Sequence, residues 1–179
     1  MLESNRQHRE YKLVQEDFNH RKMWTTVKTE YPTGDIIVSD GTNYYSLFGM
    51  PVNRGQSFNP RNGYLLMAKR RSGDNWSSKW QVQISITGKA MVLASNTVFV
   101  AGAPLVFDPV DLGGTYAGRR GAILWAASAV NGSKLAEYKL EVLPDWDGMA
   151  AAYGCLFIVN QDGSIECWGN RRKVTSFRS

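Results

Sequence analysis

The sequence predicts an all-β protein built from repeated antiparallel sheets, and three observations support this fold class. Apolar runs of four to seven residues alternate with turn-forming pairs such as Asn131-Gly132 and Asp162-Gly163, which favour tight connections between strands. The pattern of one long stretch returns further along the chain. Within each unit, a strand of small residues precedes a strongly β-forming strand. Together these features predict a stacked or radial repeat architecture.

The length, composition and net charge are those expected of a single domain of soluble type. The chain has 179 residues, enough to bury a hydrophobic core, and its net charge of +5 permits an acidic partner without arguing for one. No apolar run approaches the roughly 20 residues needed to cross a bilayer. The polar N-terminus also lacks the apolar segment of a secretory signal.

The repeat is visible when residues 63–102 are placed above residues 121–160, an offset of 58 residues without a gap. Phe99 then meets Phe157, and the apolar and turn positions coincide although few residues are identical. A weaker, earlier copy covers residues 35–49. We therefore expect about two and a half to three similar units.

Each unit predicts four antiparallel strands, which in the most complete unit are AMVLA (90–94), TVFVA (97–101), ILWAASA (123–129) and LAEYKLE (135–141). Four such strands form one blade of a β-propeller, and small residues suit the first strand because it would line the crowded central channel. Trp and Tyr on the outer strand are expected to cover the seam between blades. The predicted fold is thus β-propeller-like, with about two and a half to three blades.

The last unit, residues 147–169, predicts only three strands and contains both cysteines. If Asp162-Gly163 is a two-residue turn, Cys167 faces Ile158 and Cys155 points to the other face of the sheet. We therefore expect two free, buried thiols rather than a disulfide.

Two insertions rich in Gly, Pro, Asn and Asp, residues 48–62 and 103–120, interrupt the units between their second and third strands. Loops of this length are often functional. We expect them to form a ligand or partner surface together with Trp146 and Asp147. The candidate residues of this surface are Trp146, Asp108, Asp111, Arg119 and Arg120.

The units AMVLASNTVFVAGAP, GRRGAILWAASAVNGSKLAEYKL and DGMAAAYGCLFIVNQDGSIECWG resemble the pyrroloquinoline-quinone-like (PQQ-like) β-propeller repeat proteins, especially large multi-domain members from environmental bacteria. The step from Ile123 to Trp125, followed by Asn131 to Leu135, is similar to the core of that repeat, and the resemblance covers about residues 63–169. It implies a ring of seven or eight blades, and an exported protein of the periplasm or cell surface.

The resemblance implies that this chain is the C-terminal portion of a longer propeller. Residues 1–21 are expected to form a polar arm, either a short helix or loosely attached, residues 22–170 the blades, and residues 171–179 a basic tail. Residues 22–30 have the pattern of an outer strand and either complete the last blade or belong to an upstream blade. We favour the upstream blade, because closed propellers usually have four or more blades.

The function expected from the resemblance is a non-catalytic scaffold or binding surface, with no catalytic residue and no cofactor for this chain alone. Its partners would be other propeller blades, copies of itself, a protein or a glycan. The alternative is part of a quinoprotein-type oxidoreductase that binds PQQ and calcium, with Asp145 and Asp147 near the cofactor and Trp146 stacking beside them. Adjacent cysteines typical of such enzymes are absent, and the segment 144–148 is predicted to be a turn between blades. A third hypothesis is carbohydrate binding through Trp76, Trp125 and Trp146, although packing in the seam is favoured for Trp125.

Other motifs give weaker signals. His8 and His20 lack ligand partners at metal-binding spacing, so no metal site is assigned to them. Asp108 and Asp111 offer oxygens suited to calcium, but a self-solvating polar loop is the favoured interpretation. The basic clusters at 69–71, 119–120 and 171–173 are interpreted as charged strand ends, loop feet and a frayed tail rather than as a nucleic-acid surface.

Overall fold

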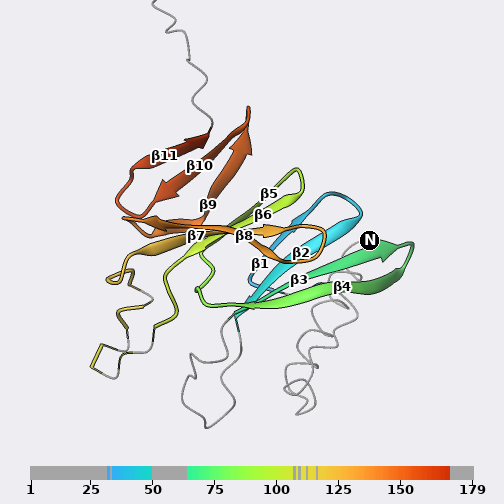
Figure 1. Ribbon diagram of the computed structural model, residues 1–179, viewed down its shortest axis with the longest axis horizontal. Coiled ribbons are helices and arrows are strands. Elements are labelled where there is room, and N and C mark those ends of the chain that lie inside the picture. The colour runs from blue at the N-terminus through green and yellow to red at the C-terminus, as the bar shows by residue number, and fades with distance from the viewer. Residues whose placement is uncertain are drawn as a thin grey trace, which may run out of the picture.

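The computed structural model describes residues 32, 34–49, 64–106, 108, 110–111, 113–115 and 117–169. Within these residues all regular structure is β, and no helix is present that could cross a membrane. Three antiparallel sheets contain four, four and three strands (Figure 1). Over the described residues, the sequence prediction of an all-β protein made of antiparallel units is therefore confirmed.

Each sheet is a meander in which every strand pairs with the next one along the chain. Sheet 1 consists of β1 (Ile36–Ser39), β2 (Asn43–Gly49), β3 (Tyr64–Ser72) and β4 (Asn75–Ile84). Sheet 2 consists of β5 (Ala90–Ala94), β6 (Thr97–Gly102), β7 (Ala122–Ser128) and β8 (Lys134–Leu140). Sheet 3 consists of β9 (Pro144–Ala152), β10 (Cys155–Asn160) and β11 (Ile165–Gly169).

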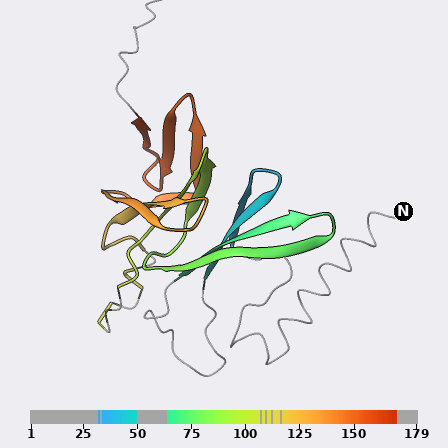
Figure 2. The same cartoon turned by 45° about the vertical axis from the view of Figure 1, so that its right-hand side comes forward.

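The first strands of the three sheets lie side by side. β5 contacts β1 on one flank and β9 on the other, and the N–H of Asp147 in β9 donates to the carbonyl of Lys89 just before β5, at 2.9 Å. The remaining strands of each sheet follow from this first strand in chain order. The hairpins β1–β2, β5–β6 and β9–β10 also point in the same direction (Figure 2). Small side chains at Ala90 and Ala94 suit strands that must approach one another this closely.

Sheet 2 lies between the other two sheets and packs on both. Because successive side chains of a strand point to opposite faces, Val98 and Val100 join the apolar core shared with sheet 1. Phe99 and Ala101 belong to the separate core shared with sheet 3. Two apolar seams, each formed by alternate residues of the same strands, therefore hold the three sheets together.

Trp80 of β4 closes the outer part of the seam between sheets 1 and 2. Its indole Nε1 donates to the carbonyl of Ala129, in the turn after β7, at 3.1 Å. The ring also lies against Gly132, where an added Cβ would come within 2.6 Å of it. The sequence prediction that a Trp on the outer strand covers the seam is confirmed.

Two local predictions are wrong. The segment Pro144–Gly148 is not a turn between sheets but the start of β9, which begins four residues earlier than the small-residue run. The hairpin at Asp162-Gly163 is not a two-residue turn, since the N–H of Asn160 donates to the carbonyl of Ser164 and leaves three residues in the loop. Gly163 has φ 83°, as a three-residue hairpin with a bulge requires.

Several predictions fall outside the described residues: the arm at 1–21, the outer-strand pattern at 22–30, His8 and His20, most of the loop 48–62, and the tail at 171–179. Phe48 and Gly49, at the start of that loop prediction, belong to β2.

Candidate functional site

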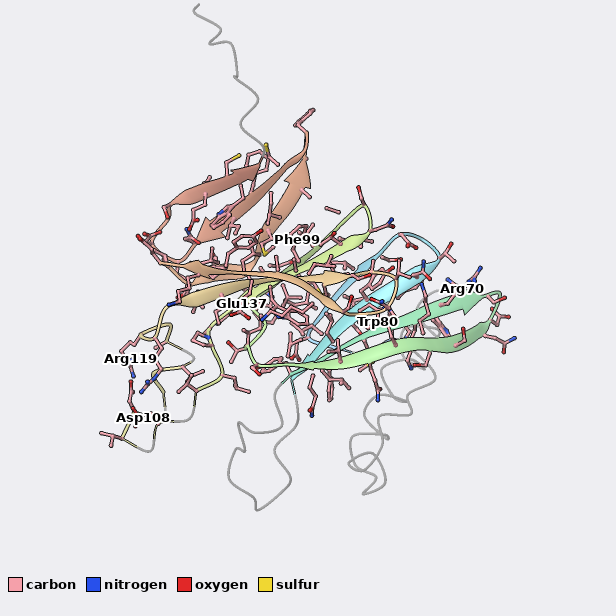
Figure 3. The ribbon with its side chains drawn as sticks, viewed as in Figure 1. Arg70, Trp80, Phe99, Asp108, Arg119 and Glu137 are labelled. Atoms are coloured by element: carbon pink, nitrogen blue, oxygen red, sulfur yellow. The ribbon has the colours of Figure 1, made fainter. Side chains whose placement is uncertain are left out.

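The loop between β6 and β7 brings together four of the five predicted surface residues. The Nε–H of Arg119 donates to Oδ2 of Asp111 at 3.1 Å, and its guanidinium also pairs with the other carboxylate oxygen. Arg120 forms an ion pair with Asp108 in the same loop. The labelled Asp108 and Arg119 lie at the end of the molecule opposite the hairpin tips (Figure 3).

These ion pairs engage the charged side chains that the sequence suggested for binding a ligand or partner. Hydrogen bonding from Arg119 lowers the pKa of Asp111, and Asp111 in turn raises the pKa of Arg119. The charges therefore satisfy each other, and the carboxylates act as internal braces. The loop is also tied down where the Thr115 hydroxyl donates to the carbonyl of Val106 at 2.6 Å.

The fifth predicted surface residue, Trp146, lies in β9 and is 56% exposed. Its neighbours Asp145 and Asp147, the candidate cofactor residues, are exposed as well. A carboxylate oxygen of Asp145 accepts the backbone N–H of Trp146 at 2.8 Å, while Asp147 has φ 53°. Among the described residues, no three His, Cys, Asp or Glu side chains gather in an arrangement that could hold a metal ion.

The other two tryptophans proposed for sugar stacking pack against protein. Trp125 is only 7% exposed and belongs to the core between sheets 1 and 2, as the sequence favoured. Trp76 makes an edge contact with Tyr44 at 4.9 Å between ring centroids, and Arg71 lies over its ring.

The two cysteines are free, as predicted, but they are not buried, since Cys155 is partly exposed and Cys167 is exposed. The geometric reason given for the absence of a disulfide was also wrong. The observed register pairs Cys167 with Phe157 and Cys155 with Gly169, so both thiols lie on the same face of sheet 3. Partial desolvation of its sulfur, and secondly a hydrogen bond with Cys155, raise the pKa of the exposed Cys167 thiol. The two thiols are therefore diagonal neighbours across two strands.

The basic cluster at 69–71 lies at the end of a strand, as predicted, but that strand is not at an open edge of its sheet. It lies in β3, which pairs with β2 on one side and β4 on the other. Lys69 is buried, whereas Arg70 and Arg71 are exposed near the end of the strand.

A groove of about 540 Å³ that sequence reasoning missed lies between the hairpins β5–β6 and β9–β10. Its wall is formed mainly by small and apolar side chains, and it includes three aromatic residues, Phe99, Tyr153 and Trp168. None of its twelve lining residues is Asp, Glu, Lys, Arg or His. The only sequence signal for this groove was the repeat itself, which places Ser95 and Tyr153 at equivalent hairpin tips 58 residues apart.

Trp168 is held in place within this groove by a short chain of polar contacts. Its indole Nε1 donates to Oε2 of Glu166 at 2.8 Å, and the buried Asn160 amide donates to the other oxygen of that carboxylate at 2.9 Å. The ring of Tyr138 on β8 packs against Trp168 at 5.5 Å between centroids. The side chain is thus fixed from both sheets.

No known protein-family model matches the chain, and no curated protein matches it significantly.

Proposed function

We propose that this chain is a non-catalytic, propeller-type repeat module of the PQQ-like kind, part of a larger ring, that acts as a scaffold and binding surface. The observation that carries the proposal is the side-by-side placement of β1, β5 and β9, each the first strand of its own meander. Propeller blades are meanders that share their innermost strands around one axis in this way. The ion-paired aspartates of the long loop support a structural role for its charges.

The packing of sheet 2 identifies where such a scaffold would bind its next neighbour. Phe99 and Ala101 of β6 are packed in the seam with sheet 3. The repeat and the strand register place Phe157 and Val159 of β10 at the equivalent positions, on the outer face of sheet 3. On that face Val159 is 39% exposed and Ile165 of β11 is 67% exposed. Sheet 3 therefore presents the apolar pattern that sheet 2 uses to bind its neighbour, and no other sheet of the described residues covers it.

The number of strands in sheet 3 also favours association at this face. Sheets 1 and 2 each end on a fourth strand, whereas β11 is the last strand of sheet 3 within the described residues. An apolar sheet face with an unpaired outer strand is a site for association with another sheet. We propose that a further sheet of the same repeat packs on this face, and that the isolated chain uses it to bind a second copy.

Light scattering on a size-exclusion column tests this proposal. We expect concentration-dependent association of the unmodified chain, and a monomer when Val159→Lys and Ile165→Lys place two charges on the outer face of sheet 3. The matched control is Val130→Lys with Leu135→Lys, which adds two charges at apolar positions of the β7–β8 hairpin that are 64% and 56% exposed. A monomeric unmodified chain at every concentration, or association that persists in the sheet 3 variant, would refute the proposal.

A further inference from the structure

We propose that the groove between the hairpins β5–β6 and β9–β10 binds an uncharged pyranose ring, either free or as part of a glycan. The proposed scaffold function does not require this site. The site also differs from the outer face of sheet 3, because its Leu156 and Trp168 face sheet 2 whereas Phe157 and Val159 face outward, and only Cys155 of strand β10 belongs to both surfaces. The two proposals can therefore fail separately.

The first argument is the prepared aromatic surface. A pyranose ring presents a flat C–H face that packs on an aromatic ring, and binding is stronger when that ring is already fixed in place. Trp168 meets this requirement, because Glu166 accepts its indole N–H and Tyr138 packs against the ring. Phe99, from the facing strand of sheet 2, adds a second aromatic side chain to the groove.

The second argument is the backbone at the rim. Tyr153 is 100% exposed at the tip of the β9–β10 hairpin, with φ 54°. Left-handed backbone is unfavourable for a bulky side chain, and such strain tends to persist where a function needs the residue. The equivalent tip of the β5–β6 hairpin has φ 52° but carries the small residue Ser95. A ligand lying on Trp168 could be covered from this rim by the tyrosine ring.

The third argument is the chemistry of the lining. A volume of about 540 Å³ falls within the usual range for small-molecule sites. Because no charged side chain lines the groove, it gives no counter-ion to a phosphate, a carboxylate or an amine. Hydroxyl groups of Ser95 and Thr97, together with backbone groups at the hairpin tips, can hydrogen-bond the hydroxyls of a neutral sugar.

Binding of the full chain to a printed array of neutral and acidic glycans, followed by calorimetry with a retained neutral glycan, tests this inference. We expect retention of neutral glycans, and roughly a tenfold loss of affinity in Trp168→Ala, as expected when a central aromatic contact is removed. Trp76→Ala serves as the control, since Trp76 packs on Tyr44 and does not line the groove, and its affinity should change less than twofold. Retention of acidic glycans alone, no retention at all, or equal binding by Trp168→Ala would overturn the proposal.

A second variant separates loss of the site from loss of the fold. Tyr153→Asn introduces a residue that tolerates the left-handed backbone and removes only a fully exposed ring. We expect its Tm to rise while its affinity for the same glycan falls. A variant that is more stable and binds as well as the unmodified chain would remove Tyr153 from the site and contradict the role given to its strain. The same calorimetry on the Val159→Lys and Ile165→Lys chain should show unchanged affinity, because those residues lie on the other face of sheet 3.

Discussion

Replacing Gly132 with alanine should destabilise the protein far more than the same change at another left-handed glycine. Gly132 has φ 76°, and a Cβ there would lie 2.6 Å from the ring of Trp80. Left-handed backbone costs an alanine about 1–2 kcal/mol, and forcing an atom into a packed contact costs about 1–3 kcal/mol more. If the ring moves away, the hydrogen bond from Trp80 to Ala129 is also weakened. We expect a total loss of about 3 kcal/mol.

Gly163 provides the matched control. It has φ 83° and no atom within 4 Å of an added Cβ, so Gly163→Ala should cost only the conformational term of about 1–2 kcal/mol. The difference between the two variants therefore isolates the packing of Trp80 on the neighbouring sheet.

Urea unfolding followed by circular dichroism measures both changes, and a double-mutant cycle completes the test. In a Trp80→Ala background the cost of Gly132→Ala should fall to that of Gly163→Ala, because the ring that it meets is absent. Equal costs for the two glycine variants in the unmodified chain, or strictly additive effects in the cycle, would show that Trp80 does not hold sheets 1 and 2 together as described.

Three further outcomes are expected. Ile158→Ala should lower the free energy of unfolding by about 2–5 kcal/mol, because Ile158 is fully buried in the seam between sheets 2 and 3. Val159→Ala on the outer face should lower it by less than about 1 kcal/mol, and urea unfolding measures both changes. The carboxyl of Asp111 should titrate below its usual value in carbon-detected NMR, and Arg119→Gln should raise its pKa. The stability from this pair is present above the unfolded pKa of about 3.9 and is lost as the pH falls through the lower folded pKa. An NMR titration midpoint of Asp111 that Arg119→Gln leaves unchanged would contradict the pairing. Alkylation of Cys167 by iodoacetamide should show a pH midpoint above the usual thiol value of about 8.5, since its pKa is raised, and a lower midpoint would contradict the described surroundings of the thiol.

The strands could be predicted from the sequence because their signals are local and occur repeatedly. Apolar alternation and turn residues mark β5, β6, β7 and β8, and the offset of 58 residues transfers the same pattern to neighbouring units. The seam role of Trp80 followed from its place on an outer strand. Features that repeat in the chain were thus the most predictable ones.

The errors occurred where a single residue or a distant strand decides the outcome. One additional loop residue changes the pairing of Cys167 from Ile158 to Phe157, and nothing in the Asp-Gly pair reveals this change. The turn signals of Pro144–Gly148 were overridden because that segment lies beside the residues preceding β5, where Asp147 donates to Lys89. Long-range pairing of this kind leaves no local pattern.

The groove could not be predicted for a similar reason. Its walls come from two hairpin tips in different sheets, and the network that fixes Trp168 includes Tyr138 from a third hairpin. By contrast, Asp108, Asp111, Arg119 and Arg120 lie in one loop because they are close in the sequence, but their mutual ion pairing depends on the loop conformation.

The most direct test of the central claim is a map of methyl NOEs in the selectively labelled protein. The packing of successive sheets through alternate faces predicts contacts from Val98 and Val100 to Leu47 or Leu66 of sheet 1, and from Leu156 or Ile158 to Leu124 of sheet 2. Val159, on the outer face, should show no contact with sheets 1 or 2 in the monomeric state. Contacts of Ile158 with sheet 1, or the absence of any contact between sheets 2 and 3, would contradict this packing of successive sheets, on which the proposed function rests.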